Sequence, residues 1–184
     1  MPRSPYSHSK HQHLQPFLPS IEGSEDALFC VVSTCELSAE TYQALQASAQ
    51  RLGYDLRQCA YIVLNKQSSK LAEEHNNIAA NTQTRYTATE QPNSNNNTTA
   101  VRNTLTPHDL LTIIEAIDPL CVVLTDHEST KAASAGYNVA LSLEAKERLL
   151  GRGCCCFENF EDLLTTPEGK QKAWACLKTL PHNE

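Results

Sequence analysis

Continuous runs of apolar residues recur four times along the chain and predict buried strands. They span residues 27–32 (ALFCVV), 60–64 (AYIVL), 120–124 (LCVVL) and 154–157 (CCCF). Runs of this length without polar alternation are typical of strands that are covered on both faces, as in a parallel sheet. We therefore expect these four strands to form the centre of the domain.

The segments between the runs carry apolar residues at helical spacing. Three of the predicted helices begin at side chains suited to N-capping, namely Ser38, Thr106 and Thr166. Two shorter helices are expected at 129–135 and 143–150, each followed by a glycine. Strands that alternate with helices in this way predict an α/β fold, specifically a three-layer α/β/α sandwich with a central, mostly parallel four-stranded sheet.

Two segments lack this pattern and are predicted to be disordered. Residues 1–26 are rich in Ser, Pro, His and Gln and are expected to form an N-terminal tail, in which FLP at 17–19 is a candidate anchor. Residues 66–104 are polar and Asn-rich and are expected to form an insertion, with one weak helix near 69–80. Everything else within 27–181 is predicted to be a single domain.

Composition narrows the classes of function. The formal net charge is −6 at pH 7, and no run of Lys or Arg suggests a surface that grips nucleic acid. Most of the eight cysteines lie within or beside apolar runs, where a free thiol packs as a small hydrophobe. With no signal peptide and no membrane-spanning segment in the sequence, we expect a reduced, cytoplasmic protein.

The loops that follow the predicted strands hold the candidate chemistry, because ligands of such sheets bind beyond the carboxyl ends of the strands. An acid, a histidine and an amide at one edge could form a hydrolytic site with Asp126 or Glu36 as the base. The competing interpretation is that strand-end loops are polar simply because they meet solvent. The candidate ligand-binding residues at this edge are Thr34, Glu36, Asn65, Asp126, His127 and Asn159, and the alternative catalytic set is Asp126, His127 and Glu158.

Other kinds of site are not supported by the sequence. Neither a P-loop nor a dinucleotide-binding glycine motif follows any predicted strand, and no G-x-S-x-G elbow is present, so no cofactor is expected. The histidines within 8–13 have no Cys or acidic neighbours at ligand spacing, and the cysteines at 154–156 have no C-x-x-C partner. We therefore expect no metal site, core packing for 154–156, and Cys35 as the better candidate for a reactive thiol.

Three stretches between about residues 27 and 180 follow the element order of a known family. They are LGYD at 52–55 leading into a strand that ends at Asn65, the helix, proline and strand of 110–124, and LLTTPEGKQKAW at 163–174. In this order of elements the chain resembles the uracil-DNA glycosylase superfamily. The resemblance implies the fold stated above and a site at the carboxyl ends of the strands.

The chain departs from that family at its catalytic motifs. Active members carry a loop like Gly-Glu-Ala-Pro-Gly after the first strand, where this chain has STCELS at 33–38. Their His-Pro-Ser loop after the fourth strand is replaced by Phe157, Glu158 and Asn159. A glutamate cannot stabilise an anion that develops on the base, and it repels phosphate. Asn159 is expected instead to cap a short helical turn.

These departures predict a catalytically inactive, glycosylase-like domain that acts through protein interactions, as an adaptor in DNA replication or repair. A protein partner is expected, and direct DNA binding is expected to be weak or absent. The psi subunits of bacterial DNA polymerase III resemble glycosylases in outline and lack the same loops, so the chain is similar to them in this respect. Two alternatives stay open: a divergent DNA glycosylase or other hydrolase, and a domain that binds a small ligand at the strand ends.

Overall fold

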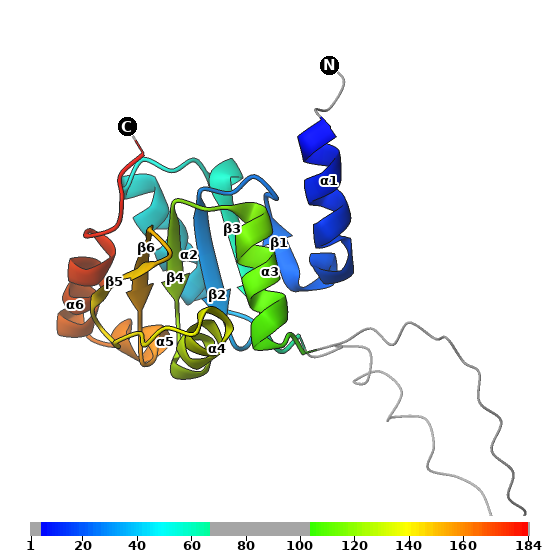
Figure 1. The fold of residues 1–184 in the computed structure, drawn as a ribbon. Coiled ribbons are helices and arrows are strands. Elements are labelled where there is room, and N and C mark those ends of the chain that lie inside the picture. The colour runs from blue at the N-terminus through cyan, green and yellow to red at the C-terminus, as the bar shows by residue number, and fades with distance from the viewer. Residues whose placement is uncertain (1–4, 67–103, 184) are drawn as a thin grey trace, which may run out of the picture.

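A six-stranded sheet runs through the middle of the molecule in the order β1-β3-β2-β4-β6-β5 (Figure 1). The computed structural model describes residues 5–66 and 104–183. The four central strands are parallel to one another, and each contains most of one apolar run from the sequence. The α/β fold class is thereby confirmed. These strands are β2 (Phe29–Ser33), β3 (Cys59–Val63), β4 (Cys121–Leu124) and β6 (Arg152–Cys156).

The expected four-stranded sheet is too small, because one antiparallel strand is added at each edge. At one edge β1 (Ile21–Gly23) pairs with β3, and at the other β5 (Lys146–Leu149) pairs with β6. Neither strand carries an apolar run, since β1 has three residues and β5 is mostly charged. Short or charged edge strands are common because they discourage pairing with another chain.

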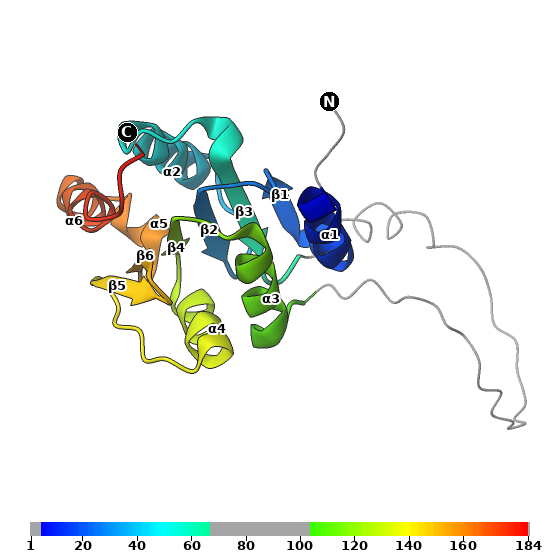
Figure 2. The ribbon, with the colours of Figure 1, turned by 45° about the horizontal axis from the view of Figure 1, so that its top comes forward.

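Helices cover both faces of the sheet (Figure 2). Side chains from α1, α3 and α4 pack in one hydrophobic core, and side chains from α2, α5 and α6 pack in the other. Because both faces are covered, the central strands are apolar throughout and do not alternate with polar residues. The helices are α1 (Pro5–Leu14), α2 (Ala39–Arg51), α3 (Pro107–Ile117), α4 (His127–Tyr137), α5 (Phe160–Leu163) and α6 (Pro167–Leu177), with short 3-10 helices η1 (Gln15–Ser20) and η2 (Leu56–Gln58).

The three predicted N-caps are confirmed. The Ser38 hydroxyl accepts a hydrogen bond from Thr41 N at 3.3 Å, and the Thr106 hydroxyl accepts one from Asp109 N at 3.2 Å. Thr166 accepts in the same way from the backbone N of the third residue of α6. Each cap satisfies a backbone N–H that has no partner inside the helix.

The prediction of a disordered tail over 1–26 is wrong for the part that the structure describes. Leu14 at the end of α1 is fully buried, and Phe17 and Leu18 pack against the core beside α3, so 17–19 is not a free anchor. Lys10 Nζ donates to the carboxylate of Asp26 and to the carbonyl of Ile117. Because the segment is mostly polar, these few apolar contacts could not be recognised from the sequence. They are favourable only because the rest of the fold provides a surface for them.

The prediction of a helix over 143–150 is also wrong. Its leucine spacing suits a helix, but Glu144 and Leu150 have positive φ angles of 55° and 48°, which interrupt helical geometry. The residues between them pair with β6, with Glu147 opposite Cys154. The expected insertion at about 66–104, with its weak helix near 69–80, lies almost entirely outside the described residues.

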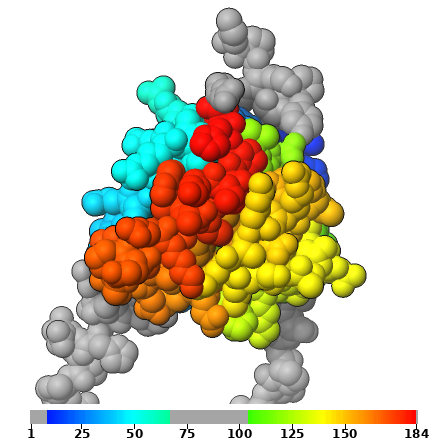
Figure 3. All heavy atoms as spheres, turned by 90° about the vertical axis from the view of Figure 1, so that its left-hand side faces the viewer, coloured from blue at the N-terminus to red at the C-terminus, as the bar shows by residue number. Residues whose placement is uncertain are grey.

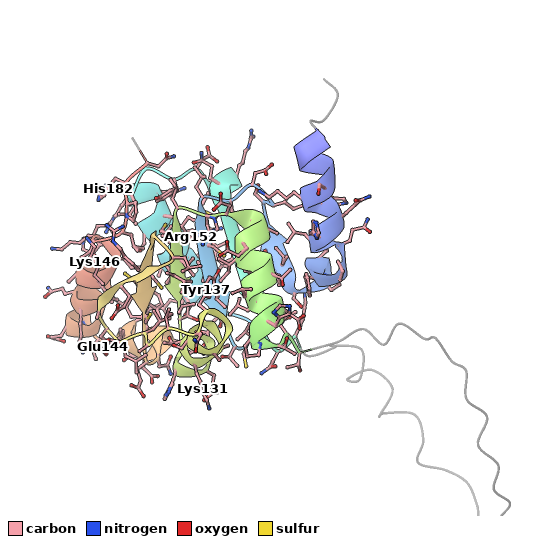
Figure 4. The ribbon with its side chains drawn as sticks, viewed as in Figure 1. Lys131, Tyr137, Glu144, Lys146, Arg152 and His182 are labelled. Carbon is pink, nitrogen blue, oxygen red and sulfur yellow. The ribbon has the colours of Figure 1, made fainter. Side chains whose placement is uncertain are left out.

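Side-chain networks join distant parts of the chain. Arg152 on β6 makes a two-point ion pair with Glu115 of α3 and a further one with Asp118 at 2.8 Å, and Tyr137 of α4 also donates to Glu115. Figure 4 shows Arg152 and Tyr137 near α3. The C-terminal segment packs between the α2 and β5 regions (Figure 3). There the Tyr54 hydroxyl donates to the carbonyl of Pro181 at 2.8 Å.

Candidate functional site

The loops after β2, β4 and β6 line one cavity at the carboxyl ends of the strands, with a volume of about 350 Å³. We call it the rim cavity. It brings together five of the six predicted ligand-binding residues and all three alternative catalytic residues: Thr34, Glu36, Asp126, His127, Glu158 and Asn159. Asn65 is the exception, because the end of β3 lies outside this lining and its backbone pairs with Thr34 and Thr104.

Asp126 at the end of β4 is bound by donors from three segments. Its carboxylate accepts from the backbone N of Thr34 at 2.8 Å and from the Thr34 hydroxyl. It also caps α4 by accepting from Ser129 N at 2.8 Å, and it accepts from the Thr125 hydroxyl at 3.2 Å. The Ser33 hydroxyl approaches at 3.5 Å. Asp126 therefore ties the loop after β2 to the start of α4.

These bonds also set the ionisation of Asp126. Burial alone would raise the pKa of the carboxyl group, but the hydrogen bonds from Thr34, Ser129 and Thr125 outweigh it and hold the pKa below its usual value. A general base works best when its pKa lies near the working pH, so the shift is in the wrong direction for that role. The carboxylate is an N-cap and a crosslink, whereas the sequence had suggested a candidate base.

Asn159 caps α5, as predicted. Its side-chain oxygen accepts from the backbone N of Glu161 at 3.1 Å, and its amide donates to the carboxylate of Asp162 at 2.8 Å. An isolated β-bridge joins the backbone of Asn159 to that of Asp126. The amide is thus engaged in local structure.

Among the alternative catalytic residues, His127 and Glu158 are the two whose side chains are mostly exposed. Their side chains are 60% and 66% exposed, and His127 Nδ1 lies 4.0 Å from the Glu158 carboxylate. The backbone N of His127 donates to the carbonyl of Glu158, which holds the two loops side by side. Exposed groups in water gain little of the electrostatic strengthening that a catalytic site requires.

The mouth of the rim cavity is acidic. Four exposed glutamates line it, namely Glu36, Glu128, Glu158 and Glu161. Asp126 adds a further carboxylate, and His127 is the one basic side chain among the lining residues. A surface of this sign repels phosphate groups over about 8–10 Å at physiological ionic strength. It suits a positively charged partner surface better than a nucleic-acid backbone.

The cysteines at 154–156 pack in the core, as the sequence predicts. Cys154 and Cys156 face one core and Cys155 faces the other, and all three are fully buried. A hydrogen bond with Cys156, with burial next, raises the pKa of Cys154, so this thiol stays protonated and inert. Cys35 is the exposed cysteine, and it lines the rim cavity.

Comparisons with known proteins add no family. No protein-family model and no curated protein matches the chain. Among the described residues, none of the helices has the length and apolar character needed to cross a bilayer. No group of three or more His, Cys, Asp or Glu side chains is placed to hold a metal ion in the same part of the chain.

A second cavity was not foreseen from the sequence. We call it the tyrosine cavity, because Tyr42 of α2 and Tyr61 of β3 line it with their rings 4.4 Å apart. Its volume is about 240 Å³, and it lies where β1, β2 and β3 meet the loop after β2. The sequence of β3 gave no sign of this cavity, because Tyr61 is one of several apolar residues in a continuous buried run.

Proposed function

We propose that the chain is a catalytically silent, uracil-DNA glycosylase-like α/β domain that acts through contacts with another protein. The observation that carries the proposal is the state of Asp126, whose carboxylate is held by donors from Thr34, Thr125 and Ser129. A carboxylate in this position holds two loops together and has a lowered pKa. The replacement of His-Pro-Ser by Phe157, Glu158 and Asn159 supports the same proposal.

The acidic mouth of the rim cavity supports a partner with a basic surface. Exposed carboxylates of like sign speed encounters with a positive partner and disfavour nucleic acid. The resemblance to glycosylases and to psi subunits sets the expected role as an adaptor in DNA replication or repair. Direct contact with DNA is not required by this role.

An excision assay tests the silent half of the proposal. The full chain is incubated with uracil-containing single- and double-stranded DNA, and release of uracil is measured beside an active glycosylase. We expect no release. Measurable release that Asp126→Asn abolishes, while Glu168→Gln leaves it unchanged, would overturn the proposal in favour of a divergent glycosylase.

Capture of a partner tests the interaction half. The chain is used as bait under reducing conditions, in parallel with a variant in which the four rim glutamates are replaced by glutamine. We expect a partner that is lost with the rim variant and weakened by salt, whereas Glu168→Gln, outside the rim, retains it. A partner that the rim variant retains at high salt would contradict the role of this surface.

A further inference from the structure

Two cysteines from different elements meet where α6 packs on the sheet. Cys155 lies on β6, and Cys176 lies in the last turn of α6, 21 positions later in the sequence. The Cys155 thiol donates to the backbone carbonyl of Cys176 at 3.2 Å. A side-chain hydrogen bond also joins the two thiols. The packing of a helix on a strand therefore holds the two sulfur atoms next to each other.

The two thiols differ in their access to solvent. Cys155 is fully buried, whereas Cys176 is partly exposed and packs at the margin of the same core. Cys176 Sγ lies 3.7 Å from the carbonyl oxygen of Ala145, directly before β5. A small oxidant can thus reach Cys176 from solvent, and Cys155 can be oxidised only through Cys176.

The contact between the thiols also sets their ionisation. The hydrogen bond from Cys155 lowers the pKa of Cys176, although burial and the carboxylate of Glu144 act in the opposite direction. The same bond, followed by burial, raises the pKa of Cys155, which therefore keeps its proton. Figure 4 shows Glu144 near α6, where its carboxylate forms an ion pair with Lys172. An accessible thiol that ionises readily and has a second thiol in contact is the arrangement found in cysteines that react with peroxides.

We propose that Cys176 is a site of oxidation by hydrogen peroxide and that Cys155 converts the product into an internal disulfide. The disulfide joins α6 to β6 and is reversed by thiol reductants. This chemistry goes beyond the proposed function and does not depend on whether the domain is catalytic or on which partner it binds.

The atoms and electrons balance over two steps. The Cys176 thiolate attacks one peroxide oxygen, so that an S–O bond forms, the O–O bond breaks, and the departing hydroxide takes a proton from solvent to become water. The Cys155 sulfur then attacks the resulting sulfenic acid. An S–S bond forms, the S–O bond breaks, and hydroxide leaves with the Cys155 proton as a second water. The two thiols lose two electrons, which reduce one peroxide to two waters.

The other cysteines lack one of these conditions. The sulfur atoms of Cys154 and Cys156 are 3.8 Å apart, but both residues are fully buried, so an oxidant does not reach them. Cys35 is exposed, but no hydrogen bond of the described residues joins it to another thiol. The remaining cysteines are single buried residues in the two cores, namely Cys30, Cys59 and Cys121.

Mass spectrometry of the full chain tests the proposal. The reduced protein is treated with hydrogen peroxide at neutral pH, its free thiols are blocked with N-ethylmaleimide, and it is digested without reductant. We expect a linked peptide that contains Cys155 and Cys176, increases with the peroxide dose and disappears after treatment with dithiothreitol. A Cys35→Ser protein, which lacks the exposed thiol, is the matched control and is expected to form the same link.

Variants of the pair separate the two steps. Cys155→Ser keeps a hydroxyl donor beside Cys176 but has no sulfur to attack it, so the sulfenic acid is expected to accumulate and to be trapped by dimedone. Cys176→Ser is expected to give neither the trapped acid nor the link. Glu144→Gln removes a charge that opposes the thiolate and is expected to speed formation of the link about twofold. Glu168→Gln, in the first turn of α6, is its control and leaves the rate unchanged.

Three results would overturn the proposal. They are the absence of the linked peptide at peroxide doses that fully modify Cys35, a link between Cys154 and Cys156 in its place, and a link between Cys155 and Cys176 that forms only after denaturation. Circular dichroism confirms the folding of each variant, and the map of the wild-type protein needs no variant. Because none of these measurements involves release of uracil or capture of a partner, their failure leaves the proposed function standing.

Discussion

The rim cavity and the tyrosine cavity share the loop after β2 but differ in how their polar groups are paired. In the rim cavity, donors from three segments surround the Asp126 carboxylate. Beside the tyrosine cavity, the Tyr61 hydroxyl is buried and has only a weak interaction with Gln46, which falls short of full hydrogen-bond geometry. Paired polar groups hold a structure together, whereas an unpaired buried group weakens it. The comparison shows that Asp126, a candidate base by its place in the sequence, is held by structural hydrogen bonds.

The test with the largest expected effect removes the Asp126 carboxylate. Asp126→Ala deletes the cap of α4 and every bond to the loop after β2, and is expected to lower the free energy of unfolding by about 3 kcal/mol. Urea denaturation measures the change. Glu158→Gln, in an exposed neighbour on the same rim, is the control and is expected to change stability by less than about 0.5 kcal/mol. An Asp126→Ala protein as stable as wild type would show that the carboxylate is not structural.

The second test uses pH. Because the folded pKa of Asp126 lies below its unfolded value of about 3.9, its stabilisation is complete above that value and is lost as the pH falls through the folded pKa. Asp126→Asn cannot titrate there, so its stability deficit relative to wild type is expected to shrink as the pH is lowered from about 5 to about 2. Urea unfolding across this range measures the deficit. A deficit that stays constant would contradict the lowered pKa.

The third test compares two buried tyrosines by the same conservative change. Tyr54→Phe loses the hydrogen bond to the carbonyl of Pro181 and is expected to lower the free energy of unfolding by about 1 kcal/mol. Tyr61→Phe loses no bond and is expected to leave stability unchanged or to raise it slightly. Thermal and urea unfolding of the pair decide the point. A loss at Tyr61 equal to the loss at Tyr54 would mean that its hydroxyl is satisfied in solution.

The smallest expected effect concerns His127 and Glu158. Their side chains are mostly exposed and 4.0 Å apart, so the double variant His127→Gln with Glu158→Gln is expected to change stability by less than about 0.5 kcal/mol. Each single variant is expected to change stability by a similarly small amount, and the two substitutions are expected to show little energetic coupling. A coupling energy well above this limit in a double-mutant cycle would indicate an organised pair and would reopen the alternative hydrolase.

The four central strands were predictable because a strand that is covered on both faces must be apolar along its whole length. Capping by Ser38 and Asn159 was predictable because it depends on residues within three positions in the sequence. The role of Asp126 was not predictable, because its partner Thr34 lies 92 positions earlier in the sequence. In addition, the helix that Asp126 caps begins at His127, two residues before the predicted start. The strand β5 and the burial of the Tyr61 hydroxyl were missed for the same reason. Both depend on which elements pack alongside in the fold, and the local spacing of residues does not contain that information.

The docking of the N-terminal segment has a consequence for the order of folding. The strand β1 pairs with β3, and Leu14 packs in the core that contains Ile113 and Ile117. A ribosome makes α1 before α3, so the surface that receives Leu14 is complete only about a hundred residues later, or about 5–20 s at usual rates of synthesis. Within the described fold, a segment that is made early is therefore among the last to be placed.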